Sequence, residues 1–154
     1  MIYQRKIGWC GAATVCNALR CYNRKVTQRR VCLLAGGGSK EGLDEHDLIQ
    51  ALSALNHSTS TISTDKESDA IGTLQFEARS HPVIISAEKE DHWVVVIGVL
   101  GDRFILFDSN RTLRNKAENG VQVLTPGKLA RYWVGKGGKY FGIVVGPKIE
   151  VKEE

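Results

Sequence analysis

Cys10 is the residue whose type and position most clearly suggest chemistry. It lies in the run GWCGAA at residues 8–13, and from Gly11 to Arg20 apolar residues recur at helical spacing. We therefore expect Cys10 at the first turn of a largely buried helix. The partial positive charge and the free N–H groups of a helix N-terminus favour a thiolate over a thiol. Cys10 is thus a candidate nucleophile.

A nucleophilic thiol needs a general base, which is itself oriented by a third polar group. His92 is the best candidate for the base, because it opens the most apolar stretch of the chain, residues 92–99. Asp108 ends the next apolar run, and a turn at Gly101-Asp102 would bring both ends together in an antiparallel hairpin. A two-residue turn offsets His92 and Asp108 by about three positions, so a twist or bulge is expected to close the gap.

Four further residues complete the candidate site. Gln4, six residues before Cys10, is a candidate to stabilise an oxyanion together with the backbone N–H of Cys10. Gly11 has no side chain that would obstruct a substrate backbone, which makes it a candidate for substrate binding. Trp9 and Trp93 flank the proposed Cys and His, and either could bind an apolar substrate group, although core packing is an equal alternative.

The remaining cysteines and histidines are assigned no chemistry. The cysteines form no C-x-x-C pair, their spacing fits a zinc site poorly, and a disulfide framework is not expected. We expect neither a metal nor another cofactor. The structural cysteines are Cys16, Cys21 and Cys32. The histidines without an assigned role are His46, His57 and His81, of which His46 is expected to face solvent.

Length and composition describe an ordinary globular protein. The 154 residues, 42% hydrophobic and 25% charged, fit one domain, which we place at residues 1–148 with a tail at 149–154. No apolar run is long enough for a membrane helix, and residues 1–6 lack the apolar stretch of a signal peptide. We therefore expect a cytoplasmic protein without a membrane segment.

The net charge of +4 arises partly from one basic cluster. A nucleic-acid binder would present a stronger basic patch interleaved with aromatic residues, and only Tyr22 lies near this cluster, so nucleic-acid binding is not expected. The glycine-rich run at residues 36–40 lacks the spacing of a phosphate-binding loop and is interpreted as a connection. The cluster comprises Arg20, Arg24, Lys25, Arg29 and Arg30.

The periodicity of apolar residues changes along the chain from helical to strand-like. The N-terminal half predicts four helices, at residues 11–20, 27–34, 43–55 and 67–78. A Ser- and Thr-rich passage, residues 56–65, is expected to be a polar connection. Runs rich in Val, Ile and Phe then predict strands at residues 83–87, 92–100, 103–108, 121–124 and 140–146. The predicted fold class is α+β, a helical N-terminal half packed on a mostly antiparallel sheet.

Taken in order, these motifs resemble the papain-like double-glycine leader peptidases, which process bacteriocin precursors. The resemblance rests on Gln4, CGAA at 10–13, HPVI at 81–84, HWVVV at 92–96 and FD at 107–108, together with the helix near residues 43–55. It implies a papain-like fold and supports the roles assigned to Gln4 and to the Cys, His and Asp. Two features differ from the family: Trp9 stands where family members often carry Asp, and family members are usually fused to a membrane transporter. The resemblance therefore supports the catalytic residues better than it supports the family's substrate specificity.

The function expected from these residues is that of a cysteine peptidase acting on a peptide or protein. Cys10 would attack the carbonyl of a peptide or isopeptide bond and form an acyl-enzyme. The same residues can deamidate glutamine or transfer an acyl group. A catalytically silent papain-like module that binds a peptide is the alternative from another class. The sequence leaves the oligomeric state open.

Overall fold

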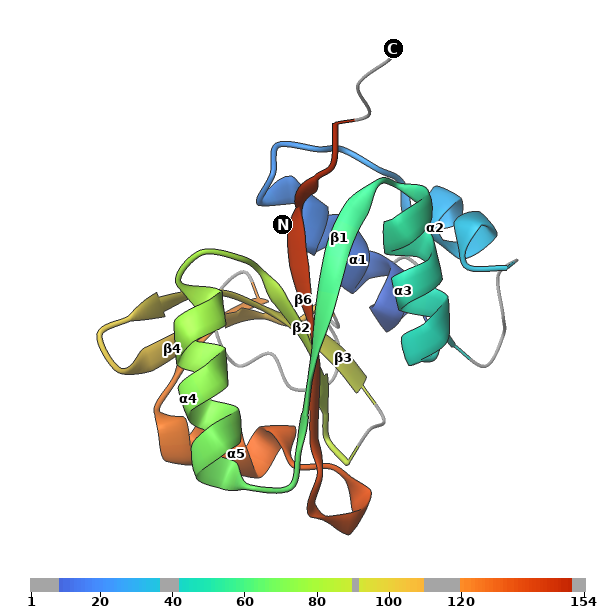
Figure 1. Ribbon diagram of the computed structural model, residues 1–154. Coiled ribbons are helices and arrows are strands. Elements are labelled where there is room, and N and C mark those ends of the chain that lie inside the picture. Colours follow the sequence, from blue (N-terminus) through green and yellow to red (C-terminus); the bar gives the residue numbers. More distant parts are fainter. Residues whose placement is uncertain (1–8, 37–41, 90–91, 110–119, 151–154) are drawn as a thin grey trace.

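The structure, a computed structural model, describes residues 9–36, 42–89, 92–109 and 120–150. These residues form a six-stranded antiparallel sheet with helices on both faces (Figure 1). The helices there are α1 (Cys10–Arg20), α2 (Gln28–Leu34), α3 (Glu45–Ala54), α4 (Glu67–Ala78), α5 (Pro126–Trp133) and the 3₁₀ turn η2 (Lys136–Gly138). The strands are β1 (His57–Thr64), β2 (Val83–Ala87), β3 (His92–Leu100), β4 (Arg103–Phe107), β5 (Val121–Leu124) and β6 (Tyr140–Lys148).

The sheet separates two apolar cores. Its strand order is β1-β6-β2-β3-β4-β5, with α1, α2 and α3 on one face and α4 and α5 on the other (Figure 1). Successive side chains of a strand point to opposite faces, so Ile84 and Val95 join the core under α1, whereas Ile85 and Val94 join the core under α4 and α5. The α+β prediction is confirmed, with helices covering both faces.

Helix α1 is the central helix of its layer. All its residues from Gly11 to Leu19 are buried, and only the two ends are partly exposed. The hydroxyl of Thr14 donates a hydrogen bond to the backbone oxygen of Trp93, 3.1 Å away, which ties α1 to the start of β3. The helix therefore holds its first residue, Cys10, in a fixed position at the end of the sheet.

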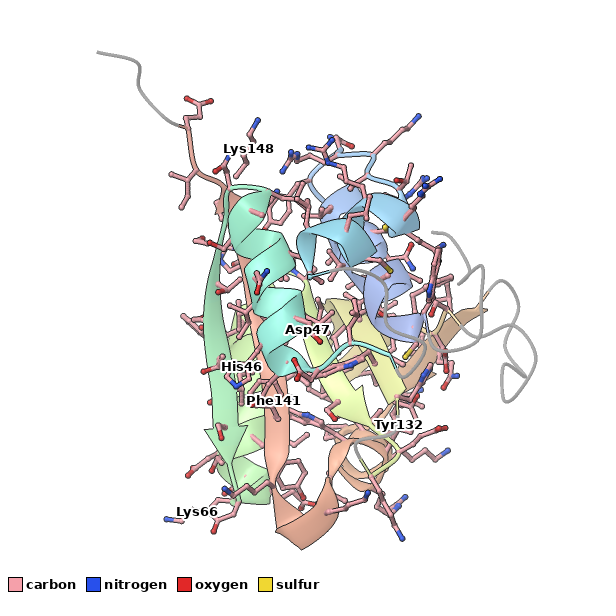
Figure 2. All side chains as sticks on the ribbon, turned by 90° about the vertical axis from the view of Figure 1, so that its right-hand side faces the viewer. His46, Asp47, Lys66, Tyr132, Phe141 and Lys148 are labelled. Atoms are coloured by element: carbon pink, nitrogen blue, oxygen red, sulfur yellow. The ribbon has the colours of Figure 1, made fainter. Side chains whose placement is uncertain are left out.

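The predicted amphipathic helix at residues 43–55 is confirmed as α3. Its N-terminus has a capping box, in which Asp44 accepts from the backbone N–H of Asp47 and Asp47 accepts from that of Asp44, both at 2.9 Å. His46 lies at the surface on the first turn of α3, and its side chain is 87% exposed, as predicted (Figure 2). No helix within the described ranges is both long enough and apolar enough to span a membrane.

Apart from the short turn η2, two elements differ from the sequence-based expectation. Residues 57–64 form the edge strand β1 instead of a polar connection, and β1 pairs with β6 along most of its length. Only His57 and Ile62 of this strand are buried, so its Ser- and Thr-rich surface hid the alternation that predicts strands. Helix α5 was not predicted, although the Thr125 hydroxyl caps Lys128 N–H and Pro126 occupies the first turn, both signals of a helix start.

Candidate active site

The Cys10 thiol lies at the N-terminus of α1, as the sequence predicted. Trp9 is the N-cap residue, and its carbonyl accepts the first helical hydrogen bond from Ala13 N–H at 2.9 Å. Cys10 itself is partly buried. The backbone N–H groups of Gly11 and Trp93 hydrogen-bond to its sulfur, so donors from a helix and a strand converge on the thiol.

His92 and Asp108 form a buried pair beside this thiol. The Nε2–H of His92 donates to Oδ1 of Asp108 at 2.7 Å, and the two residues are only 8% and 5% exposed. The His92 side chain also hydrogen-bonds to the Cys10 thiol. Because Nε2 is engaged by Asp108, the ring nitrogen that serves Cys10 is Nδ1. The three side chains therefore form a continuous hydrogen-bonded row.

A β-bulge between β3 and β4 brings His92 and Asp108 to the same face of the sheet. Near the turn Leu100 pairs with Arg103, but the register shifts between Val96 and Gly98, and beyond it Val95 pairs with Phe107. Continued by one residue, that register sets Asp108 opposite Val94, which is two residues from His92. Without the extra residue Asp108 would be opposite Val95, whose side chain points to the other face. The bulge expected from the sequence is thus confirmed.

The pKa of Cys10 lies below its usual 9.0 despite burial. Burial on its own raises the pKa, because it penalises the charged thiolate. This effect is outweighed by the hydrogen bond from His92, the N–H of Trp93, the positive charge of His92 and the N–H of Gly11. The site therefore favours the thiolate through its partners.

The pKa of His92 shifts in the complementary direction. Burial lowers the pKa, but the hydrogen bonds to Asp108 and Cys10, together with the negative charges of these two residues, raise it from 6.5 to about 10. His92 is therefore protonated at neutral pH. A thiolate beside an imidazolium is the state in which a cysteine nucleophile is both charged and paired with a proton donor.

The residues assigned to substrate binding are closely packed. A Cβ on Gly11 would lie 3.1 Å from Leu48 Cδ2, 3.3 Å from Leu43 Cβ and 3.3 Å from Trp93 Cδ1, which gives this glycine a packing role. The Trp93 indole N–H donates to the Leu43 carbonyl at 2.9 Å. Trp9 is half-buried against the same core. A contact of Gly11, Trp9 or Trp93 with substrate stays a prediction.

Gln4 lies outside the described residues, so its place in an oxyanion hole also stays a prediction. Cys16 and Cys32 are buried and Cys21 is exposed. Burial raises the pKa of the Cys21 thiol, which is the opposite of the shift at Cys10. Within the described ranges no three His, Cys, Asp or Glu side chains are grouped so that they could hold a metal ion.

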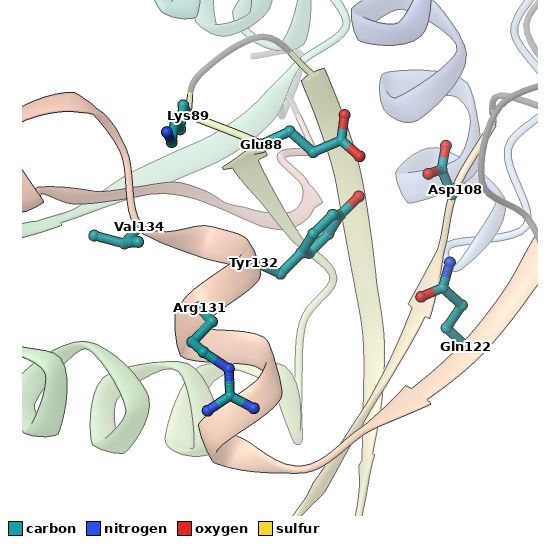
Figure 3. Close-up of a pocket in the computed structure, with 7 residues that line it drawn as sticks. All are labelled: Glu88, Lys89, Asp108, Gln122, Arg131, Tyr132 and Val134. Carbon is teal, nitrogen blue, oxygen red and sulfur yellow. The ribbon is translucent and has the colours of Figure 1, made fainter.

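A pocket of about 540 Å³ adjoins the site at Asp108 (Figure 3). Its walls come from the loop after β2, from β5 and from the end of α5. Sequence reasoning did not find it, because it depends on α5, whose only sequence signal is the cap at Thr125-Pro126. The lining residues are Glu88, Lys89, Asp108, Gln122, Arg131, Tyr132 and Val134.

Comparison with known proteins identifies the fold. No model of a protein family matches the sequence, and no curated protein matches it either. The peptidase domain of ComA from Streptococcus is similar in structure, with a TM-score of 0.70 at 17% identity over 96% of this chain and 97% of that one. ComA is a bifunctional ABC transporter involved in a quorum-sensing pathway. A double-glycine-motif protease from an AMS/PCAT transporter, solved with its leader peptide, gives 0.71 at 18% identity over 96% and 91%.

UfSP from C. elegans is also similar, with a TM-score of 0.67 at 15% identity over 97% of this chain but only 33% of UfSP. The chain therefore has the α+β fold of the papain-like cysteine peptidases, with the double-glycine peptidase domains among its structural neighbours. The fold and the resemblance predicted from the sequence are both confirmed.

Proposed function

We propose that this protein is a cysteine peptidase in which Cys10 is the nucleophile. The observation that carries the proposal is the hydrogen-bonded row Cys10–His92–Asp108 at the N-terminus of α1. The structural neighbours support peptidase activity, since two of them are peptidase or protease domains. A peptide substrate is supported by the leader peptide bound to one of these neighbours.

In the first step the Cys10 thiolate attacks the carbonyl carbon of the scissile bond. The C–N bond then breaks, and the imidazolium of His92 gives its proton to the leaving amine. Asp108 accepts from Nε2–H of His92 throughout, which orients the ring and stabilises its positive charge. The product of this step is a thioester on Cys10 and a free amine.

In the second step water hydrolyses the thioester. Neutral His92 takes a proton from the attacking water, the C–S bond breaks, and the thiolate–imidazolium pair is restored. The oxyanion formed in each step would accept from the backbone N–H of Cys10 and from the side-chain amide of Gln4. A reducing compartment such as the cytoplasm suits this mechanism, because it keeps the four free thiols reduced.

The proposal is tested by incubating the protein with a proteome-derived peptide library and identifying new peptide termini by mass spectrometry. We expect new termini with the wild-type protein and none with Cys10→Ala, while Cys16→Ala serves as the matched control that keeps cleaving. New termini that persist with Cys10→Ala would refute the mechanism. Conversion of glutamine to glutamate without new termini would identify a deamidase, and binding of peptides without any reaction would identify a silent binding module.

A further inference from the structure

Thr14 is the only residue of α1 that carries a hydroxyl group, and most of the buried residues around it in this helix are apolar. Its side chain lies in the interior, since the residue is only 1% exposed. A buried hydroxyl costs free energy unless it is hydrogen-bonded, and valine would fill nearly the same space without that cost. Packing alone therefore does not explain a threonine at this position, and the partner of its hydroxyl becomes the informative contact.

That partner is the main chain of Trp93, which α1 contacts at both of its polar groups. The Trp93 carbonyl accepts from the Thr14 hydroxyl at 3.1 Å, and the Trp93 N–H donates to the Cys10 sulfur. In an antiparallel strand the N–H and the C=O of one residue point to the same side. Cys10 and Thr14 are four residues apart, so they lie one above the other on the same face of α1. One side of a single helical turn thus binds Trp93 at two points.

The main chain of Trp93 is directly connected to the catalytic row. Its N–H donates to the thiol, and the same planar peptide bond joins it to His92. A displacement of the Trp93 main chain would therefore move a donor to the sulfur and the backbone of the base together. The Trp93 side chain has a separate anchor, because its indole N–H donates to the Leu43 carbonyl at 2.9 Å.

We propose that Thr14 is a positioning residue of the active site, whose hydrogen bond to the Trp93 carbonyl holds the Trp93 N–H and the backbone of His92 against the Cys10 sulfur. The inference rests on the proposed role of Cys10 as the nucleophile. A hydrogen bond to a charged acceptor is stronger than one to a neutral acceptor, so the Trp93 N–H favours the thiolate. A donor that is held in place beforehand stabilises this charge without reorganisation. Thr14 thus acts on the thiol through Trp93.

The pH profile of Cys10 alkylation tests this role without a substrate. Thr14→Val removes the hydroxyl and keeps the shape of the side chain. We expect the midpoint of Cys10 labelling by iodoacetamide to move to higher pH, and the labelling rate at pH 7 to fall roughly three- to tenfold, the factor that corresponds to one neutral hydrogen bond. Thr14→Ser keeps a hydroxyl at the same position and should restore the wild-type midpoint and rate.

Cys16→Ala is the matched control for a loss of stability, because it truncates another buried side chain of α1. It should lower the temperature of thermal unfolding and leave the Cys10 midpoint in place. If Thr14→Val is folded and keeps the wild-type midpoint and rate, the positioning role is refuted. An equal shift in Cys16→Ala also refutes it, since any loosening of α1 would then have the same effect. If Thr14→Val does not fold, Thr14→Ala removes the same hydroxyl with a better helix former.

NMR spectroscopy shows whether the change occurs at the main chain of Trp93. In the wild type the backbone amide signal of Trp93 should shift with pH at the midpoint of Cys10 labelling, because this N–H donates to the sulfur. The amplitude of that shift should decrease in Thr14→Val and return in Thr14→Ser. The indole N–H signal should stay in place, since Leu43 still accepts from it. A displaced indole signal with an unchanged backbone titration would show that Thr14 only packs Trp93, which refutes the proposal.

Failure of this inference and failure of the peptidase proposal give different results. For a peptide that the wild-type protein cleaves, Thr14→Val should lower kcat and leave KM unchanged. If peptides are cleaved but Thr14→Val keeps the wild-type kcat and labelling midpoint, the peptidase proposal stands and the positioning role is refuted. If no peptide is cleaved but the midpoint moves in Thr14→Val and returns in Thr14→Ser, the peptidase proposal fails and the positioning of the thiol by Thr14 is supported.

Discussion

The first turn of α1 and the middle of the same helix each carry a cysteine, and the two thiols have opposite properties. The pKa of Cys10 is below 9.0, whereas burial raises that of Cys16 to about 12. Both are affected by burial, which acts against the thiolate in each case. The difference is that the Cys10 sulfur accepts hydrogen bonds from His92 and from the backbone N–H groups of two other residues, Trp93 and Gly11. Partners brought by β3, more than the helix alone, therefore lower the pKa of the Cys10 thiol.

The largest expected effect follows from replacing each thiol in turn. Cys10→Ala should lower turnover by roughly 10⁶-fold, because the nucleophile, base and orienting group act as one unit. Cys16→Ala should leave turnover near that of the wild type and lower the free energy of unfolding by about 1 kcal/mol, as is common for a buried substitution. Peptide cleavage rates and denaturant unfolding measure the two quantities. A Cys16→Ala protein that is folded but inactive would show that the comparison is wrong.

A smaller effect is expected from weakening the partner of His92. Asp108→Asn should reduce kcat by roughly 10²- to 10⁴-fold, the range typical of acid–base catalysis, because an amide does not stabilise the imidazolium. The pKa of His92 should fall from about 10, since its first stabilising partner loses the negative charge. NMR titration of the His92 ring measures this change. An unchanged titration with reduced kcat would assign Asp108 another role.

The pH dependence of thiol alkylation separates the two cysteines directly. Iodoacetamide reacts with the thiolate, so labelling of Cys10 should increase as pH rises through a midpoint below 9, while Cys16 should remain largely unlabelled until pH approaches about 12. In His92→Ala the burial effect is no longer offset by His92, and the Cys10 midpoint should move upward. Peptide mapping of the labelled protein gives both curves. Equal labelling of Cys10 and Cys16 at pH 7 would contradict the pKa difference.

The proposed mechanism predicts a second limit of turnover at high pH. The proton that His92 gives to the leaving amine is lost as pH rises through its pKa of about 10, and the thiolate is lost as pH falls through the Cys10 pKa. The rate profile should therefore be bell-shaped, with its alkaline limb set by His92. In Asp108→Asn the alkaline limb should move to lower pH. An alkaline limb that Asp108→Asn leaves in place would show that another group controls it.

The sequence predicted the members of the site better than their geometry. Cys10, His92 and Asp108 could be chosen because a helix start and two strand ends place polar side chains at the limits of apolar runs. The contact of His92 with Asp108 depends on the extra residue between Val96 and Gly98, and the position of a bulge within a uniform run of Val and Ile has no local signal. Only the need for some correction was predictable, from the two-residue turn.

Sequence reasoning missed one edge strand, β1, and one short helix, α5. Strand β1 forms the edge of the sheet and buries only His57 and Ile62, so it reads as a polar connection. Helix α5 is short and lies between β5 and β6 in the sequence, so its few apolar residues are hard to distinguish from those of the neighbouring strands. Missing α5 also hid the pocket, because Arg131, Tyr132 and Val134 form one of its walls. Both β1 and α5 depend on tertiary packing, which the local sequence does not encode.

The smallest effect tests how tightly the first turn of α1 is packed. Gly11→Ala should lower the free energy of unfolding by about 1 to 3 kcal/mol, because the new Cβ would contact Leu48, Leu43 and Trp93 at 3.1 to 3.3 Å. Gly72→Ala is the matched control in α4, where a Cβ would have no atom within 4 Å, and it should stabilise the protein by about 0.5 to 1 kcal/mol through a higher helix propensity.

The same pair of variants shows whether this packing positions the thiol. Trp93 both contacts Gly11 and supplies a backbone N–H to the Cys10 sulfur, so displacing Trp93 should raise the pKa of Cys10 and slow its alkylation at pH 7. Gly72→Ala should leave that rate unchanged. If Gly11→Ala destabilises the fold but leaves the alkylation curve of Cys10 in place, then the first turn is packed only for stability. The reactivity of Cys10 would in that case depend on His92, and not on the fit of α1 against β3.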